Sequence, residues 1–168
     1  MSEVFNIYPA CMSAGQKRIQ DLGSRFDDDY DVVARLAALA LKFEAGAIIL
    51  LQPKRPRLIG QYKTKSTAPI ALVIENTLLA ESLNIHGFSH IKLDQPTSNE
   101  ALLPWKTATS LPMTLDEDPV GVILSFSKKE IEPIEPLQMK RLIKVKKFAE
   151  HLLSYRVQMD EFDDDIQY

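Results

Sequence analysis

The stretch PVGVILSFSKK, residues 119–129, decides the fold of this chain of 168 residues. Seven of its first eight residues are apolar, glycine or proline, and the β-branched ones are Val120, Val122 and Ile123. The acidic turn LDEDP (115–119) and the alternating stretch TATSLPMTL (107–115) come directly before it. A membrane-spanning helix needs about 20 apolar residues, so this run is too short to cross a bilayer. The pattern predicts a buried central strand that is entered through a hairpin.

The composition is that of one globular domain, and it excludes several classes of protein. Hydrophobic residues make up 45% of the chain and charged residues 26%, and the net charge of -3 argues against nucleic acid or anionic lipid as a partner. No basic segment followed by an apolar one marks a signal peptide, and no membrane span is expected, which favours a cytoplasmic location. The single cysteine, Cys11, excludes an internal disulfide, a four-cysteine zinc site and a two-cysteine redox pair.

Four helices are predicted, and three of them lie in the first and last parts of the chain. Residues 12–26 carry Ile19, Leu22 and Phe26 at helical spacing, and Asp27 to Asp29 then supply N-terminal caps for the next helix. That helix, 29–44, is the strongest in the chain, with Gly46 as its expected C-terminal stop. Its predicted buried stripe consists of Val32, Val33, Leu36, Leu39, Ala40 and Phe43. A last long helix is expected at 136–157, followed by an acidic, flexible tail at 158–168.

The remaining periodicity is that of strands. AGAIILL (45–51) and LIGQYK (58–63) form a predicted hairpin, and FSHIKLD (88–94) alternates as a strand. The stretch 68–84 favours a helix, and 95–105 reads as a long loop. We therefore expect an α+β fold, with a mostly antiparallel sheet of five or six strands and the 29–44 and 136–157 helices on one face.

Three stretches resemble the GAF domain family, a group of small-molecule-sensing and signalling modules. They are QKRIQDLGSRFDDDYDVVARLAALALKFEAGAIILL (16–51), TSLPMTLDEDPVGVILSFSKK (109–129) and LQMKRLIKVKKFAEHLLSYR (137–156). The resemblance covers residues 16 to 156, and it implies a leader at 1–11 and a single GAF-like domain at 12–157. The sequence departs from the family at Thr109, Ser110 and Leu111, where the family usually has tyrosine, alanine and glycine.

Residues that could carry chemistry are few. His86 and His90 are four apart, but Gly87 and Phe88 lie between them at a helix-to-strand transition, which argues against paired metal ligands. Cys11 lies in the leader and is expected to be an inert thiol. Phosphate-binding glycine loops are absent from the sequence, as are the cysteine set of GAF-type methionine sulfoxide reductases and the motifs of cyclic-nucleotide-binding and tetrapyrrole-binding members. Neither an enzyme activity nor a cofactor or metal is expected.

Two functional hypotheses remain. In the first, the chain is a regulatory module with a small-molecule pocket between the open face of the sheet and the segment 70–106. The ligand contacts predicted for that pocket are Tyr62, His90, Trp105 and Ser110. In the alternative interpretation, Trp105 and Tyr62 only pack against the sheet and contact no ligand. In the second hypothesis, the fold has no pocket and serves dimerisation or another protein interaction.

A homodimer through the terminal helices is also expected. On the closing helix, one apolar stripe suits the sheet: Met139, Leu142, Val145, Ala149 and Leu152. Ile143, Phe148 and Tyr155 lie partly off this stripe, so the helix needs a second surface to cover them. Ile19, Leu22 and Phe26 could supply that surface from the same chain, which would then be monomeric, or from a second copy.

Overall fold

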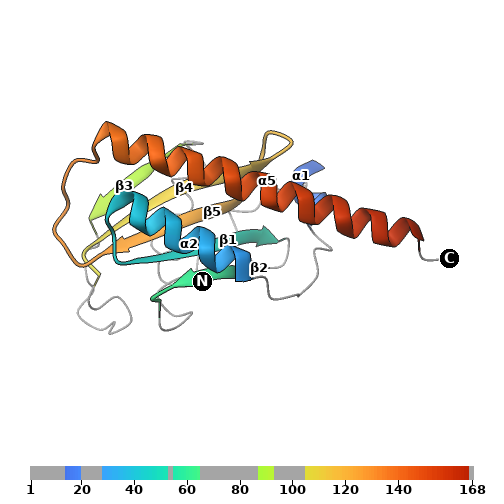
Figure 1. Ribbon diagram of the computed structural model, residues 1–168, viewed down its shortest axis with the longest axis horizontal. Helices are drawn as coiled ribbons and strands as arrows, with labels where there is room; N and C mark the ends of the chain where they lie inside the picture. The colour runs from blue at the N-terminus through green and yellow to red at the C-terminus, as the bar shows by residue number, and fades with distance from the viewer. Residues whose placement is uncertain (1–13, 20–27, 53–54, 65–86, 93–104, 167–168) are drawn as a thin grey trace, which may run out of the picture.

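Five antiparallel strands form one sheet in the order β2-β1-β5-β4-β3 (Figure 1). The computed structural model describes residues 14–19, 28–52, 55–64, 87–92 and 105–166. The strands are β1 (Ala45–Gln52), β2 (Arg55–Tyr62), β3 (Ser89–Lys92), β4 (Thr107–Leu115) and β5 (Asp118–Ser127), and the helices are α1 (Ala14–Ile19), α2 (Asp28–Leu41) and α5 (Pro136–Ile166). Helices α2 and α5 lie side by side on one face of the sheet (Figure 1). The predicted α+β class, antiparallel sheet and common helix face are confirmed.

The hairpin predicted from residues 107–129 forms the centre of the sheet. Strand β4 pairs with β5, and Leu115 lies opposite Asp118 across a turn of two residues. Both turn residues, Asp116 and Glu117, have positive φ angles of 52° and 69°, as in a type I′ turn. Such turns favour glycine and asparagine, because a side chain in the left-handed region crowds its own backbone.

Helix α2 packs against the sheet through small residues. A Cβ atom at Gly46 of β1 would overlap the backbone carbonyl oxygen of Ala34, and one at Gly60 of β2 would overlap that of Tyr30. The side chains that α2 buries are Tyr30, Val33, Ala34, Ala37, Ala38, Ala40 and Leu41. The predicted stripe is therefore wrong for Val32, Leu36 and Leu39, which are exposed, whereas Val33 and Ala40 are buried and Phe43 is partly buried. Because the two glycines let the helix lie very close to the sheet, alanine rather than leucine fits between the helix and the sheet.

The end of α2 also differs from its predicted position. Lys42 has a φ angle of 58°, the amide of Lys42 donates to the Leu39 carbonyl, and the amide of Phe43 donates to the Ala38 carbonyl. These two hydrogen bonds are those of a Schellman cap. The helix therefore ends at Leu41, and Gly46, the predicted stop, belongs to β1.

Helix α5 is longer than predicted and extends beyond the sheet at its C-terminal end (Figure 1). It buries Leu142, Ala149, Leu153 and Val157 in the core between the sheet and the helices, with Met139, Val145 and Leu152 partly buried beside them. Residues 158–166, expected as a flexible tail, are helical. No helix among the described residues is long and apolar enough to cross a membrane.

Helix α1 connects the hairpin turn with α5. Ile19 is buried in the same core, so this part of the predicted N-terminal surface packs within the chain. The guanidinium of Arg18 forms ion pairs with Asp116 in the turn and, at 2.9 Å, with Glu161 in α5. The expected leader (1–11), Leu22 and Phe26, the helix at 68–84 and most of the loop at 95–105 lie outside the described residues.

Candidate functional sites on the two faces of the sheet

One row of residues crosses the helix-covered face of the sheet from edge to edge. Pairing between neighbouring strands aligns Tyr62, Gly46, Ser125, Thr109 and His90 in the order of the strands. Gly46 contacts the backbone of α2, so the whole row faces the helices. Tyr62 and His90 stand at opposite ends of this row, four strand spacings or about 19 Å apart.

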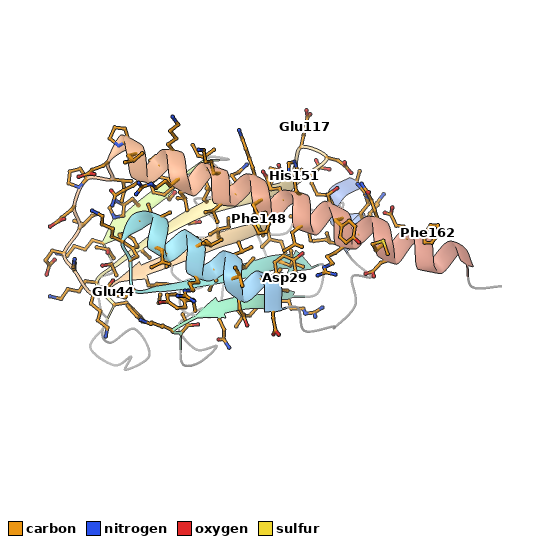
Figure 2. All side chains as sticks on the ribbon, viewed as in Figure 1. Asp29, Glu44, Glu117, Phe148, His151 and Phe162 are labelled. Atoms are coloured by element: carbon orange, nitrogen blue, oxygen red, sulfur yellow. The ribbon has the colours of Figure 1, made fainter. Side chains whose placement is uncertain are left out.

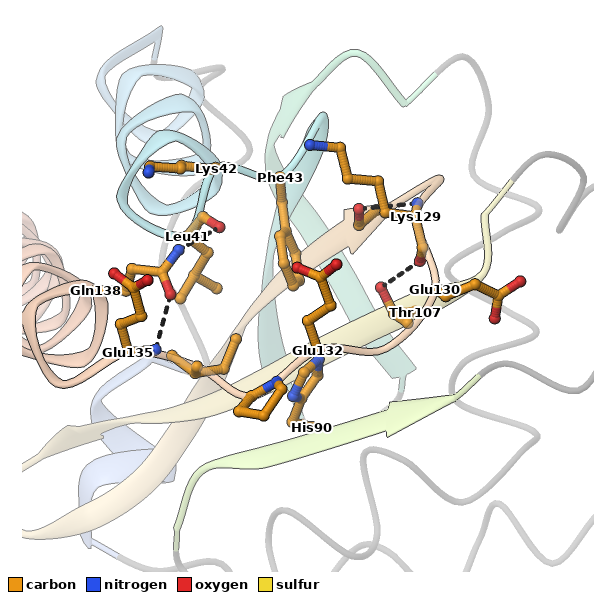
Figure 3. A pocket seen from close by; sticks show the side chains of 13 residues that line it. Leu41, Lys42, Phe43, His90, Thr107, Lys129, Glu130, Glu132, Glu135 and Gln138 are labelled. Carbon is orange, nitrogen blue, oxygen red and sulfur yellow. Dashed lines mark hydrogen bonds between the residues drawn. The ribbon is translucent and has the colours of Figure 1, made fainter.

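His90 lies beside a cavity of about 150 Å³ at the end of the helical layer (Figure 3). The cavity is lined by Phe43, by the start of β4, by the end of β5 and by the segment that leads into α5. The imidazole ring lies 6.0 Å from the ring of Phe43 and 6.4 Å from that of Phe88, measured between centroids. Its Nε2 atom is buried without a hydrogen-bond partner, and burial lowers the pKa of His90 below its usual 6.5. We therefore expect a neutral imidazole at pH 7.

The lining of this cavity mixes charges of both signs with apolar rings. Lys42, Lys129, Glu130, Glu132 and Glu135 all contribute to it, and each of these residues is exposed. Much of the remaining polar lining is already paired. The Thr107 hydroxyl donates to the Lys129 carbonyl at 3.4 Å, and the Ser127 hydroxyl accepts from the Lys129 amide at 3.1 Å. The cavity thus offers His90 as its one buried, unpaired polar group among the described lining residues.

The opposite face of the sheet carries Ser110. This residue pairs with Ser89 of β3 and with Leu124 of β5, and Leu124 pairs in turn with Ala47 of β1. Ser110 is one position from Thr109, so strand alternation places its side chain on the face away from α2 and α5. The Oγ atom is fully buried and has no hydrogen-bond partner in the part of the chain that the structure describes.

Trp105 lies on the same side of the sheet as Ser110. Its ring is 6.0 Å from that of Phe126, which alternation places on the face away from the helices. The ammonium of Lys128 lies 5.6 Å from the centroid of the indole, within the range of a cation–π contact. Small buried side chains share this face with them: Ala45, Ala47, Ala108 and Ser89.

The four ligand contacts expected from the sequence therefore do not form one group. Trp105 and Ser110 share the face away from the helices, whereas Tyr62 and His90 lie on the helix face. Tyr62 packs beside the guanidinium of Arg35 in α2, which lies 5.9 Å from the ring centroid. The expectation that His90 and Trp105 border a common cavity is wrong, because the strand register places His90 on the helix face and the contact with Phe126 places Trp105 on the opposite face.

Sequence reasoning also missed residues at both sites. Ser125, whose Oγ is buried and unpaired, and Phe43 belong to the helix side, and Ser89 belongs to the opposite side. The alternation in FSHIKLD separates Ser89 from His90, but only the pairing with β4 tells which of the two faces the helices. Among the described residues, no group of three or more His, Cys, Asp or Glu side chains could hold a metal ion.

Comparison with known proteins gives structural likeness without sequence likeness. No family model matches the sequence, and no curated protein matches it. Among solved structures, the GAF domain of a two-component sensor histidine kinase from Bacillus halodurans is 17% identical, with a TM-score of 0.55, and the match covers 83% of this chain and 99% of that one.

Two further GAF domains match as much or more of the chain. The blue-light absorbing form of the PixJ GAF domain from Thermosynechococcus elongatus is 7% identical, with a TM-score of 0.58 and coverage of 93% of this chain and 97% of that one. The GAF domain of the Acinetobacter phosphoenolpyruvate-protein phosphotransferase is 15% identical, with a TM-score of 0.52 and coverage of 92% and 100%. At these identities the likeness concerns the fold alone. The chain has the fold of GAF domains, as its sequence had predicted.

Proposed function

We propose that this chain is a regulatory module that binds a small molecule on the sheet face away from α2 and α5. The observation that carries the proposal is the buried, unpaired Oγ atom of Ser110. A hydroxyl buried without a partner costs about 1–3 kcal/mol. A bound ligand that forms the missing hydrogen bond with this hydroxyl removes that cost.

The surroundings of Ser110 support the same proposal. The small side chains of Ala45, Ala47 and Ala108 share this face with Ser110, Trp105 adds a broad apolar surface, and all of them are buried. Ligand sites are typically apolar surfaces with a few polar groups that fix the orientation of the ligand. The similar domains of the histidine kinase and PixJ make a sensing role the natural analogy, although a shared fold alone assigns no function.

The set of residues that we propose as ligand contacts differs from the set expected from the sequence. Ser110 and Trp105 remain, with Ser89 beside Ser110 as a further polar group. Tyr62 and His90 face the helices, so we do not include them in this site. The cavity beside His90 has a lining that is mostly paired or exposed, which favours it less as the ligand site.

A thermal-shift screen against a metabolite library tests the proposal, because binding to the folded state raises the melting temperature. We expect Ser110→Ala to raise the melting temperature of the free protein and to lose most of the ligand-induced shift. Ser125→Ala is the matched control, since Ser125 is also buried and unpaired but faces the helices. It should stabilise the free protein and keep the shift. No shift in the wild type, or an unchanged shift in Ser110→Ala, would contradict the proposal.

A second candidate function is self-association, and it rests on a different observation. Helix α2 exposes Val32, Leu36 and Leu39 by 50%, 41% and 51%. Helix α5 beside it exposes Phe148, which Figure 2 labels, by 50%. Single exposed apolar residues are ordinary, but several of them on two neighbouring helices are typical of an interface.

Light scattering tests this second function. A self-associating chain should show twice the 19.0 kDa of one copy. Phe148→Glu should give monomers. Ile143→Glu should not, because Ile143 is also exposed but lies five residues away, about 140° around the helix. A wild-type mass equal to that of one chain rejects self-association.

A further inference from the structure

The cavity beside His90 lies where several parts of the fold meet that are distant in the sequence. Its lining comes from the end of α2, from β3, from the paired ends of β4 and β5, and from the segment that leads into α5 (Figure 3). Strand β3 has four residues and lies at the edge of the sheet, where it pairs only with β4 among the described strands. A molecule in this cavity would therefore contact the edge strand and the helical layer at once.

The size of the cavity limits its occupant to about one ring. Its volume is about 150 Å³, and an apolar cavity of about that volume holds one benzene molecule. A nucleotide or a tetrapyrrole is several times larger and does not fit. The charged lining residues are all exposed, so they mark the mouth of the cavity; they are Lys42, Lys129, Glu130, Glu132 and Glu135.

The less exposed part of the lining is mostly apolar. Leu41 is buried, and Phe43 and Ile134 are partly buried and pack against the core. Gln138 also lines the cavity, but both ends of its side-chain amide are already engaged in hydrogen bonds. Burial of a charged group against such a surface is costly, so the inner part of the cavity favours an uncharged ring.

His90 supplies the one buried polar atom of this lining that has no partner among the described residues. This atom, Nε2, belongs to an imidazole ring that lies 6.0 Å from the ring of Phe43 and 6.4 Å from that of Phe88, between centroids. In a neutral imidazole, Nε2 donates or accepts a hydrogen bond according to the tautomer. A hydroxyl group can both donate and accept, so it matches Nε2 in either tautomer.

We propose that this cavity is a second ligand site, which binds a small phenol whose ring packs against Phe43 and Ile134 and whose hydroxyl forms a hydrogen bond with Nε2 of His90. The site is separate from the face that carries Ser110 and Trp105, and the inference does not depend on the function proposed for that face. The exposed lysines and glutamates at the mouth carry charges of both signs, so they select neither an anion nor a cation. A polar substituent on the ring would reach solvent there.

Phenol and toluene are matched probes for this site, because they differ only by a hydroxyl in place of a methyl group. NMR titration of each probe measures its dissociation constant, and the imidazole signals of His90 report where it binds. His90→Phe keeps a ring beside Phe43 and Phe88 but has no nitrogen. The ratio of the toluene to the phenol dissociation constant should be roughly tenfold higher in the wild type than in His90→Phe, since the variant lacks the hydrogen bond to phenol.

His151→Phe is the matched control, because His151 is exposed on α5 and does not line the cavity. It should keep the wild-type ratio. If His90→Phe does not fold, His90→Leu makes the same comparison, since leucine also has no hydrogen-bonding group in its side chain. An equal ratio in the wild type and in the folded His90 variant would overturn the proposal, as would phenol binding that leaves the His90 signals unchanged.

Ser110→Ala separates this site from the one proposed on the opposite face. Phenol should bind Ser110→Ala with the wild-type affinity and shift the His90 signals as before. Loss of phenol binding in Ser110→Ala, with unchanged binding in His90→Phe, would place phenol on the far face, which overturns the second site and leaves the proposed function standing. A wild type that binds no phenol at concentrations up to about 10 mM overturns the second site alone.

Discussion

Gln138 Nε2 donates a hydrogen bond of 3.1 Å to the backbone carbonyl oxygen of Leu41, so the first turn of α5 satisfies the last turn of α2 (Figure 3). The Oε1 atom of the same side chain accepts from the amide of Glu135 at 2.8 Å. One amide side chain thus fixes the start of the long helix to the end of its neighbour. Carbonyls in the last turn of a helix have no partner within that helix, so they depend on such contacts.

Replacing Gln138 by methionine should lower the free energy of unfolding by about 1–3 kcal/mol, because the Leu41 carbonyl loses its partner. Urea denaturation measures the loss. Gln158→Met is the control, since Gln158 lies on the same helix, is exposed, and bonds only to Ser154 among the described residues. Equal losses in the two variants would show that the link to α2 contributes no stability.

The close approach of α2 to β1 makes Gly46 intolerant of any side chain. Gly46→Ala should destabilise the protein by about 1–3 kcal/mol, the usual range for overpacking. The overlap is with the backbone oxygen of Ala34, so adding Ala34→Gly should not restore stability. If the double variant recovers the wild-type urea midpoint, the contact involves the Ala34 side chain instead.

The hairpin turn should gain from glycine. Glu117 has a φ angle of 69°, a conformation that costs a residue with a side chain about 1–2 kcal/mol. Glu117→Gly should therefore raise the free energy of unfolding by roughly 0.5–1 kcal/mol, after the entropy that glycine adds to the unfolded chain. Lys140→Gly, in the interior of α5, should lower it by about 1 kcal/mol. A loss in both variants would contradict the turn geometry.

The buried imidazole of His90 makes stability depend on pH. Burial lowers the pKa of His90 in the folded protein. Below about pH 6.5, the unfolded chain therefore binds a proton at His90 more readily than the folded chain does. The contribution of the neutral His90 to the free energy of unfolding is therefore complete above about pH 7. It is lost as the pH falls through about 6.5 towards the pKa of His90 in the folded protein. The charged residues that line the same cavity are present in every variant; they are Lys42, Lys129, Glu130, Glu132 and Glu135.

Chemical denaturation between pH 7.5 and 5 checks this prediction. His90→Gln should lose less stability than the wild type over that window, whereas His151→Gln, at an exposed position on α5, should follow the wild type. Parallel curves for the wild type and His90→Gln would contradict it.

The architecture could be predicted from the sequence because strand alternation and acidic turns are local signals. The β4–β5 hairpin follows from them, and the β1–β2 hairpin and the shared helix face follow from the order of the strand-like and helix-like segments. The buried side of α2 could not be predicted. Leu36 and Leu39 give the stronger apolar pattern, but Gly46 and Gly60 lie far along the chain, and their effect on helix packing appears only when the strands are placed against the helix.

The site was harder to predict than the fold for a related reason. Neighbouring residues of a strand face opposite ways, so an error of one position moves a side chain to the other face. Ser110 and Trp105 fell on the expected face, whereas His90 did not, because the register with β4 aligns it with Thr109 rather than with Ser110. Whether a segment forms a strand depends on its local sequence, whereas the pairing of two strands depends on segments that are far apart along the chain.

The most direct test of ligand binding on the far face of the sheet is the fluorescence of Trp105, the only tryptophan of the chain. A compound that raises the melting temperature is titrated into the wild type and into Ser110→Ala. We expect the emission of Trp105 to change to saturation in the wild type, with the change much weakened in Ser110→Ala and preserved in His90→Gln. A stabilising compound that binds without changing the emission of Trp105, or that acts equally on Ser110→Ala, would show that the ligand does not bind at this face.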